Sequence, residues 1–274
     1  MPHVLIPTDF SQNSLNAAIY AVQLYGAEGN VFTLLNTYML PRGTANTMWN
    51  IDELLAKESV EGVNVFAEKL KRELPGMKVE LRTACEHGDL SNVIRRYSGT
   101  DEMPELVVMG TQGATGLEKV LIGSNTADVI KSSDVPVLAI PENSRYRAPR
   151  RIVLADDGGP VDRRTIKVLL DIARWSQAEV MIVRVITEDP AFDTGSSSSV
   201  YDDLLGAIPH SHHYITSENV VTALHDLSDQ SDADLVVVIH RHRGIFDQLF
   251  HRSIATRLSM HTHIPMLVLQ QLPL

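Results

Sequence analysis

Short apolar runs alternate with longer amphipathic segments along the first half of the chain. The runs have the length of buried strands and lie at residues 3–8, 30–38, 78–85, 105–110 and 135–140. The segments between them predict helices, at residues 11–26, 52–74, 90–98 and 124–132. Five strands that alternate with four helices are typical of an open parallel five-stranded sheet with helices on both faces.

The first predicted helix carries its own start and stop signals. Its apolar residues form one stripe, made of Leu15, Ala18, Ile19 and Val22. Ser11 is placed to accept a hydrogen bond from a free N–H group at the helix start, and Gly26 is placed to end the helix.

The same order of elements begins again after the polar stretch at residues 141–150. Apolar runs predict strands at residues 151–157, 179–187, 212–216, 234–239 and 264–269. Helices are expected at residues 162–175, 217–229 and 253–259. The serine-rich segment 194–199 is expected to be part of a loop.

A shift of the first half by 129 positions tests this repeat without gaps. It aligns identical residues at Leu106/Leu235, Val107/Val236, Ser124/Ser253 and Pro136/Pro265. Chance rarely keeps strand, loop, helix and strand in register over such a span, so a tandem duplication is the better explanation. We therefore expect two domains, at residues 1–142 and 149–274.

Composition narrows the class of protein. The chain has 274 residues, 44% of them apolar and 21% charged, as in soluble globular proteins of two domains. No stretch approaches the eighteen or so apolar residues of a membrane helix, and the start "MPHVLIPTDF" lacks the marks of a signal peptide, so a cytoplasmic protein is expected. The single cysteine, Cys85, excludes an internal disulfide, and the net charge of −10 argues against nucleic-acid binding.

Four glycines follow the fourth predicted strand of the first half, at positions 110, 113, 116 and 123. Glycine after a parallel strand lets the backbone approach a ligand closely, and a helix that starts at Ser124 offers free N–H groups to a phosphate. Parallel sheets bind ligands at the carboxyl ends of their strands, where Asp9 and Gly110 both lie. We therefore expect Asp9 and Gly110 to face one crevice.

Two common phosphate-binding motifs are excluded by spacing. A Walker loop needs a Lys-Ser or Lys-Thr pair after its last glycine, and these glycines have none. A dinucleotide fingerprint follows the first strand of its unit, whereas these glycines follow the fourth. The spacing that does fit is G-x2-G-x9-G-[ST], filled by Gly110, Gly113, Gly123 and Ser124.

This motif resembles the universal stress protein family in its ATP-binding branch. The opening "VLIPTDFS" and the closing "VPVLAIP" of the first half are similar to the family's first and last strands. The second half has the same order of strands and helices, so the whole chain resembles a tandem universal stress protein. The resemblance implies two Rossmann-like sheets of the adenine nucleotide α-hydrolase-like type.

The resemblance also implies a nucleotide site in the first half. Asp9 would lie by the ribose or a metal ion, with Pro7 and Thr8 shaping the strand end, and Thr37 and Met109 would meet the adenine. The phosphates would be wrapped by Gly110, Gly113, Gly123, Ser124, Asn125 and Thr126. The expected cofactor is ATP or another adenine nucleotide, with Mg²⁺ held mainly by phosphate oxygens.

Simpler explanations exist for each part of this site. A glycine-rich loop is often only a tight turn, and an aspartate before a helix is commonly a capping residue. Lys119 is expected to be solvated. No catalytic base or nucleophile motif is present, so a nucleotide-binding regulator, a weak ATPase and a scaffold without ligand all stay open.

Nine of the eleven histidines lie in the second half, including "HSHH" at 210–213 and "HRHR" at 240–243. Their spacings match no metal motif, and neighbouring residues of a strand point to opposite faces. These histidines are expected to be surface or partly buried residues that bind no metal.

The second half is expected to lack an equivalent nucleotide site. Under the ungapped alignment Ile239, His242 and Arg252 replace three motif glycines, and only the serine is kept, as Ser253. Asp157 is then expected to cap a helix or to pair with Arg243 or Arg252, whose side chains could alternatively hold an anion. One nucleotide per chain is the expected stoichiometry.

Assembly follows from the two closing strands. Single-domain members of the family resemble two-fold dimers built by pairing these strands, so residues 135–140 and 264–269 are expected to pair within the chain. The chain would then be an intramolecular pseudo-dimer. A homodimer of whole chains and unknown protein partners stay open, and no membrane or nucleic acid is expected.

Overall fold

The computed structural model describes residues 2–40, 48–111, 123–186, 198–241 and 263–271. The described residues fall into two compact units, which divide after Tyr146. The predictions on Gly113, Gly116, Lys119 and the helix at 253–259 concern residues outside this part of the chain.

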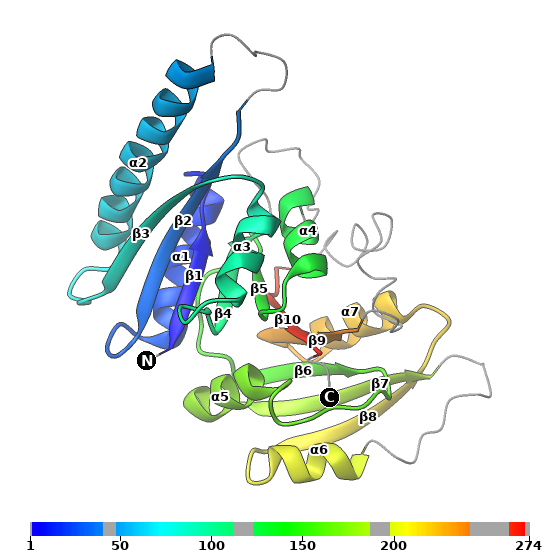
Figure 1. The fold of residues 1–274 in the computed structure, drawn as a ribbon. Helices are drawn as coiled ribbons and strands as arrows, with labels where there is room; N and C mark the ends of the chain where they lie inside the picture. Colours follow the sequence, from blue (N-terminus) through cyan, green and yellow to red (C-terminus); the bar gives the residue numbers. More distant parts are fainter. Residues whose placement is uncertain (1, 41–47, 112–122, 187–197, 242–262, 272–274) are drawn as a thin grey trace. The chain divides into compact units, whose positions relative to one another are not determined.

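The first unit is one parallel sheet in the order β3-β2-β1-β4-β5 (Figure 1). Its strands are β1 (His3–Pro7), β2 (Val31–Tyr38), β3 (Glu80–His87), β4 (Leu106–Gly110) and β5 (Val137–Ile140). Its helices are α1 (Gln12–Tyr25), α2 (Met48–Glu73), α3 (Leu90–Ser98) and α4 (Ser124–Ser132). The predicted alternation of five strands and four helices is confirmed, and Cys85 is a strand residue of β3.

Chain order reverses between β1 and β4, and this reversal decides where the helices lie. Helices α1 and α2 contact one another, as do α3 and α4. Because crossover connections between parallel strands are right-handed, the two pairs of helices cover opposite faces of the sheet. The carboxyl ends of β1 and β4 therefore lie side by side at a switch point, where such sheets bind ligands.

Helix α1 begins and ends as the sequence predicts. The Ser11 side chain accepts a hydrogen bond from the Ser14 N–H group at 3.1 Å, and Gly26 is the C-cap, whose N–H donates to the Val22 carbonyl. The buried surface is wider than the predicted stripe, since Asn13, Asn16 and Tyr20 are buried as well. Ile19, which belongs to the stripe, is only half-buried.

The polar stretch after β5 packs against α1. The Asn16 amide donates to the Ser144 carbonyl at 2.8 Å and accepts from Arg145 at 2.8 Å. The rings of Tyr20 and Tyr146 meet edge to face at 5.2 Å. The buried polar positions on α1 therefore dock the last residues of the first unit, which explains why a helix that reads as amphipathic is buried on a second side.

The second unit repeats the parallel sheet, in the order β10-β9-β6-β7-β8. Its strands are β6 (Arg151–Asp156), β7 (Glu179–Ile186), β8 (His210–Thr216), β9 (Leu235–His240) and β10 (Met266–Gln270). The described helices are α5 (Lys167–Ser176), α6 (Ser198–Leu205) and α7 (Val220–Gln230). The main differences from the sequence predictions concern α5, α6 and β8.

Helix α5 begins five residues later than predicted. The Asp162 carboxylate accepts a hydrogen bond from the Thr165 N–H group at 2.7 Å, so it closes a turn before the helix. Helix α6 was not predicted at all, because its serine-rich start reads as loop. Strand β8 begins at His210, two residues earlier than predicted.

The core of each unit is its sheet. The central strands β1, β4, β6 and β9 carry apolar side chains that are almost fully inaccessible to solvent. Within the described residues no helix combines the length and the apolar character needed to span a bilayer.

Candidate functional site

A cavity of about 220 Å³ lies at the carboxyl ends of β1, β2 and β4 in the first unit. It therefore occupies the switch point of this sheet. Ten of the eleven residues expected at a nucleotide site line it, namely Pro7, Thr8, Asp9, Thr37, Met109, Gly110, Gly123, Ser124, Asn125 and Thr126. The eleventh, Gly113, is not among the described residues.

The turn from β1 into α1 forms one wall of the cavity and is held by hydrogen bonds. The buried Thr8 hydroxyl lies 2.9 Å from the Ser14 hydroxyl and accepts from the Phe10 N–H group at 3.0 Å. The Asp9 carboxylate accepts from the Ser11 N–H group at 3.1 Å. Asp9 is thus exposed and fixed by the turn, while the cap of α1 is Ser11.

Phe10 carries the backbone strain of this turn. Its φ of 65° lies in the left-handed region, which costs a non-glycine residue on the order of 1 kcal/mol. The Phe10 ring packs on Gly62 and lies 6.2 Å from the Phe66 ring, so contacts with α2 offset the strain. The contacts of Phe10 therefore help to hold the turn that carries Asp9.

A second wall of the cavity comes from β2. The Asn36 amide donates to the Thr8 carbonyl at 2.7 Å, and its oxygen accepts from the Ser59 hydroxyl at 2.7 Å. These bonds tie the end of β2 to the end of β1 and to α2. The half-buried Thr37 follows next in the strand.

The start of α4 forms the third wall. Gly123 is its N-cap residue, so no N-cap side chain accepts a hydrogen bond from the first turn, and no other described side chain is seen to do so. In the same unit, Ser11 caps α1 and Asp89 caps α3. An uncapped helix start that lines a cavity offers free donors and the positive end of the helix dipole, which suit an anion such as phosphate.

Hydrogen bonds hold the two ends of segment 112–122 together. The Gly123 N–H group donates to the Thr111 carbonyl at 2.5 Å, and the Thr126 hydroxyl donates to the Gly110 carbonyl at 2.9 Å. The Thr126 hydroxyl therefore keeps α4 against the end of β4. Its proton is used within the protein, so Thr126 has only its N–H group to offer a phosphate.

Gly110 has a packing role that the sequence did not reveal. A Cβ atom at this position would lie 2.6 Å from the Asn13 side-chain nitrogen, closer than real Cβ atoms approach. Asn13 is buried on the first turn of α1. A side chain at position 110 would therefore force the buried Asn13 amide to move, whether or not a ligand binds.

We expect Gly110→Ala to lower the free energy of unfolding of the first unit by about 1–3 kcal/mol, because the added methyl group overpacks against Asn13. In an Asn13→Ala background the same change should cost less than about 1 kcal/mol. Native-state hydrogen exchange of the four proteins measures both costs. Equal costs in the two backgrounds would show that Asn13 is not the reason for the glycine.

Four residues of the cavity were missed in the sequence: Ser14, Leu35, Asn36 and Leu90. Asn36 stands directly before Thr37, and Leu90 starts the helix after β3, so the rule that ligands bind at strand ends could have found both. Ser14 lies inside α1, and only the folded turn brings it to Thr8.

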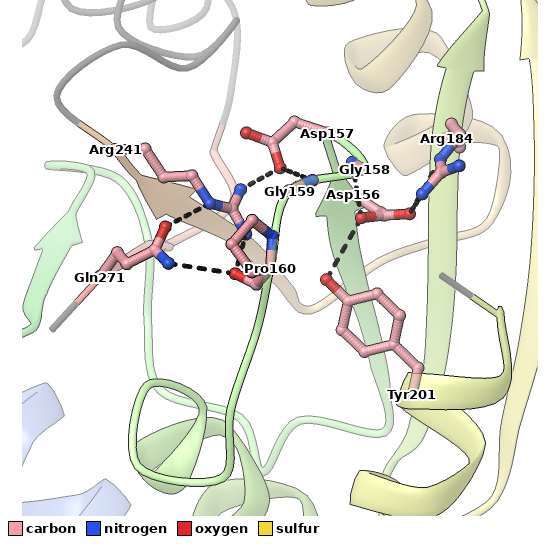
Figure 2. A network of polar contacts seen from close by, with 9 residues as sticks. All are labelled: Asp156, Asp157, Gly158, Gly159, Pro160, Arg184, Tyr201, Arg241 and Gln271. Carbon is pink, nitrogen blue, oxygen red and sulfur yellow. Dashed lines mark hydrogen bonds and ion pairs between the residues drawn. The ribbon is translucent and has the colours of Figure 1, made fainter. Parts of the chain in front are cut away.

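The corresponding strand ends of the second unit are joined by an ion pair (Figure 2). The guanidinium group of Arg241, just after β9, pairs with the Asp157 carboxylate, just after β6. Arg241 also donates to Gln271 at 2.5 Å and to the Pro160 carbonyl at 2.9 Å. Asp157 therefore pairs with an arginine, as expected, and this partner is Arg241. The partners named from the sequence, Arg243 and Arg252, lie outside the described residues.

The Arg241 side chain packs closely against Gly159. A Cβ atom on Gly159 would lie 2.8 Å from the Arg241 guanidinium carbon. The Gly159 N–H group donates to the Asp157 carboxylate at 3.1 Å. Where the first unit has an exposed aspartate beside a cavity, the second has a nearly buried aspartate paired with a cation.

A second ion pair lies deeper in the same unit. Asp156, the last residue of β6, accepts from Arg184 of β7 at 2.9 Å, and both side chains are 4% exposed. The Tyr201 hydroxyl of α6 donates to the other Asp156 oxygen at 3.3 Å, and the Gly158 N–H group donates to it at 3.0 Å (Figure 2). The Asp156 carboxylate is thus surrounded by donors.

The pKa of Tyr201 is raised far above its ordinary value, first by burial and then by the charge of Asp156. The folded protein therefore keeps this phenol neutral, whereas the unfolded chain ionises it above about pH 10. A raised folded pKa gives stability that is present below the unfolded pKa and is lost as the pH rises above it.

We expect Tyr201→Phe to cost the second unit about 0.5–1.5 kcal/mol at pH 7, because one hydrogen bond to Asp156 is lost. The difference from wild type should shrink above pH 10, by up to about 1.4 kcal/mol per pH unit, since phenylalanine cannot ionise. Tyr38, Tyr97 and Tyr146, whose pKa values are also raised, affect both proteins equally. Urea denaturation between pH 7 and 11 measures the difference; a constant gap would count against the assignment.

Comparison with known proteins gives one family. The sequence pattern of the universal stress protein family matches residues 1–141 and 149–270. The chain is 33% identical to the universal stress protein MJ0531 of Methanocaldococcus jannaschii over 141 residues, which are 50% of this chain and 80% of that protein. It is 26% identical to MJ0577 of the same organism, over 50% of this chain and 93% of that protein.

Solved structures share the fold over both units. A universal stress protein from Archaeoglobus fulgidus is similar over 98% of this chain and 96% of its own, with a TM-score of 0.69 and 22% identity. The functionally unknown protein PA1789 from Pseudomonas aeruginosa is similar over 98% of this chain and 92% of its own, with a TM-score of 0.60 and 16% identity. At these identities the likeness concerns the tandem α/β fold alone. On its two matched segments, this chain belongs to the universal stress protein family.

Proposed function

We propose that the first unit binds one adenine nucleotide, ATP in the first instance, and that the chain is a stress-response regulator whose interactions change with the bound nucleotide. The observation that carries this proposal is the uncapped start of α4 on a cavity at the switch point of the sheet. Free N–H donors at a helix start bind phosphate without further charged residues.

The lining residues give each part of the nucleotide a suitable environment. The N–H groups of Ser124, Asn125 and Thr126 would hold the phosphates, since the Gly123 N–H group already donates to Thr111. Met109, which is 5% exposed, would contact the base together with Thr37. At about 220 Å³ the cavity is smaller than the roughly 300–1,000 Å³ of typical ligand pockets, so a whole nucleotide would extend beyond it.

A magnesium ion would add charge beside the phosphates. Among the described lining residues Asp9 is the only carboxylate, and it is exposed. Mg²⁺ usually keeps several waters and binds through one or two carboxylates and substrate phosphates. One carboxylate fits this pattern, and Asp9 would hold either the ion or a ribose hydroxyl.

Hydrolysis is the second function that stays open. The described lining residues include hydroxyls and one aspartate but no histidine, lysine or glutamate. Asp9 is the one group that could act as a base, and it already accepts a hydrogen bond from the Ser11 N–H group. We therefore propose binding rather than turnover, with a phosphate-release assay as the deciding measurement.

Mass spectrometry of the small molecules that co-purify with the untagged chain tests the proposal directly. An adenine nucleotide near one equivalent per chain is the expected result. Calorimetry with ATP, ADP, AMP and GTP then ranks the ligands, and GTP should bind most weakly if Thr37 and Met109 select adenine. Absence of any nucleotide, together with no calorimetric signal for ATP, would favour a scaffold without ligand.

A further inference from the structure

Two histidine rings of the second unit contact the same carboxylate oxygen of an aspartate. The Nε2 atoms of His210 and His212 lie 3.0 Å and 2.8 Å from the same Asp202 carboxylate oxygen. One ligand atom from each of the three side chains lies within 4.8 Å of the other two. The two histidines alternate on β8 and so share one face of the edge strand, while Asp202 comes from α6.

The orientation of His210 is fixed by a backbone group. Its Nδ1 atom lies 2.7 Å from the Ile208 carbonyl, which can only accept, so Nδ1 carries a proton. In neutral histidine the Nε2 atom is then an acceptor. A carboxylate oxygen at 3.0 Å from that acceptor requires a cation between them or a second proton on the ring.

Metal-bound histidines commonly show this arrangement. A ring that donates one N–H group to a backbone carbonyl presents the lone pair of the other nitrogen to the metal. Asp202 supplies a carboxylate, which is ordinarily charged at neutral pH. Two imidazoles and a carboxylate are a ligand set that zinc accepts, with water in the fourth position.

The two distances from Asp202 need only a small increase to hold zinc. Ligands at about 2.0–2.1 Å from a tetrahedral zinc ion lie about 3.3 Å apart, compared with the 2.8 Å and 3.0 Å between Asp202 and the two rings. The Asp202 side chain is 55% exposed and can move outward, whereas the two rings are 17% and 22% exposed and are held by the strand.

We propose that Asp202, His210 and His212 form a zinc site that ties α6 to the edge strand β8. The site lies at the amino-terminal end of β8, at the edge of the sheet and away from the strand ends that carry the ion pairs of Figure 2. A bound zinc ion would hold α6 against β8, the edge strand of the described sheet of the second unit.

Zinc titration of the untagged full chain, stripped with a chelator, tests this site by calorimetry and by the shift of the melting temperature. Wild type should bind one more zinc ion than Asp202→Asn and His212→Ala. In each variant the affinity of this site should fall by at least about 100-fold, since even outer-shell changes cost 10–100-fold. His213→Ala is the matched control, because His213 is adjacent in β8 and its Nε2 faces Ser211 at 3.0 Å.

Cobalt provides a second measurement, since its absorption bands report tetrahedral coordination. The bands should be present in wild type and His213→Ala and absent in His212→Ala. Equal zinc stoichiometry in wild type, Asp202→Asn and His212→Ala would overturn the proposal, as would equal loss in the His213→Ala control. If no zinc binds and nitrogen NMR shows both ring nitrogens of His210 protonated at neutral pH, the cluster is an imidazolium–carboxylate pair instead.

Discussion

Asp156→Asn should lower the free energy of unfolding of the second unit by about 3–5 kcal/mol, because it removes the carboxylate charge that pairs with the buried Arg184 guanidinium. Both side chains of this pair are 4% exposed, so water cannot replace the lost partner. Asparagine keeps the shape of aspartate, and its oxygen can still accept from Tyr201 and from the Gly158 N–H group. The measured cost should therefore be mainly that of the charge.

Two controls separate this charge from other effects. Adding Arg184→Met to Asp156→Asn removes the buried cation as well and should recover much of the lost stability, since apolar replacements of buried pairs are often close to neutral. Asp171→Asn breaks helical pairs with Lys167 and Arg174, whose side chains are 58% and 46% exposed, and should cost no more than about 1 kcal/mol. Hydrogen exchange read for the amides of β6 and β7 gives all three values.

A cost of Asp156→Asn as small as that of Asp171→Asn would show that Arg184 reaches water after the substitution. The expected large cost would instead identify the paired charges as a structural element of this unit. Asp157 and Arg241 then extend the same arrangement to the ends of β6 and β9. These charged residues would then serve the stability of the second unit, whereas the corresponding strand ends of the first unit line a cavity.

The periodicity of apolar residues predicted the fold well because each strand is buried on both faces. β1, β4, β6 and β9 read as continuous apolar runs, and their ends differ from the prediction by at most one residue. Helix α6 was missed because serine favours caps and turns when read alone. Its Tyr201 is fully buried, so packing of the aromatic ring selects the helix over the loop that local sequence suggests.

The candidate site was predictable only where it follows from strand ends. Asp9, Gly110 and Gly123 meet at the cavity because parallel strands end on one edge. The contact between Asn13 and Gly110 and the pair of Asp157 with Arg241 join segments far apart in the chain. No local sequence pattern shows which arginine pairs with which carboxylate. A glycine that makes room for a neighbouring side chain also cannot be distinguished in sequence from one that makes room for a phosphate.

Gly123→Asp should weaken ATP binding by at least about 100-fold and leave the protein folded. Gly123 has φ −57° and ψ 154°, which any residue adopts, and aspartate is a favourable N-cap residue. Its carboxylate would accept from the N–H groups of α4 that a phosphate needs, and it would repel the phosphate. Like charges brought together cost several kcal/mol, and each 1.4 kcal/mol is tenfold in affinity.

The control for added charge is Asn219→Asp, which places a new carboxylate at the start of α7 in the second unit, where Asn219 is already the N-cap. That variant should bind ATP as wild type does. Gly123→Asp is a sharper probe than a change at Gly110, whose clash with Asn13 would confuse loss of binding with loss of folding. Calorimetry measures the affinities, and the melting temperature should stay the same or rise slightly in Gly123→Asp.

Equilibrium dialysis with labelled ATP then gives the number of sites. We expect one site per chain in wild type and none in Gly123→Asp, because the Arg241 guanidinium in the second unit joins Asp157, Gln271 and the Pro160 carbonyl at the equivalent strand ends. A single site kept in Gly123→Asp would place the nucleotide outside the cavity of the first unit. Two equivalent sites in wild type would mean that ATP can displace the Arg241–Asp157 ion pair. The pair would then not prevent nucleotide binding in the second unit.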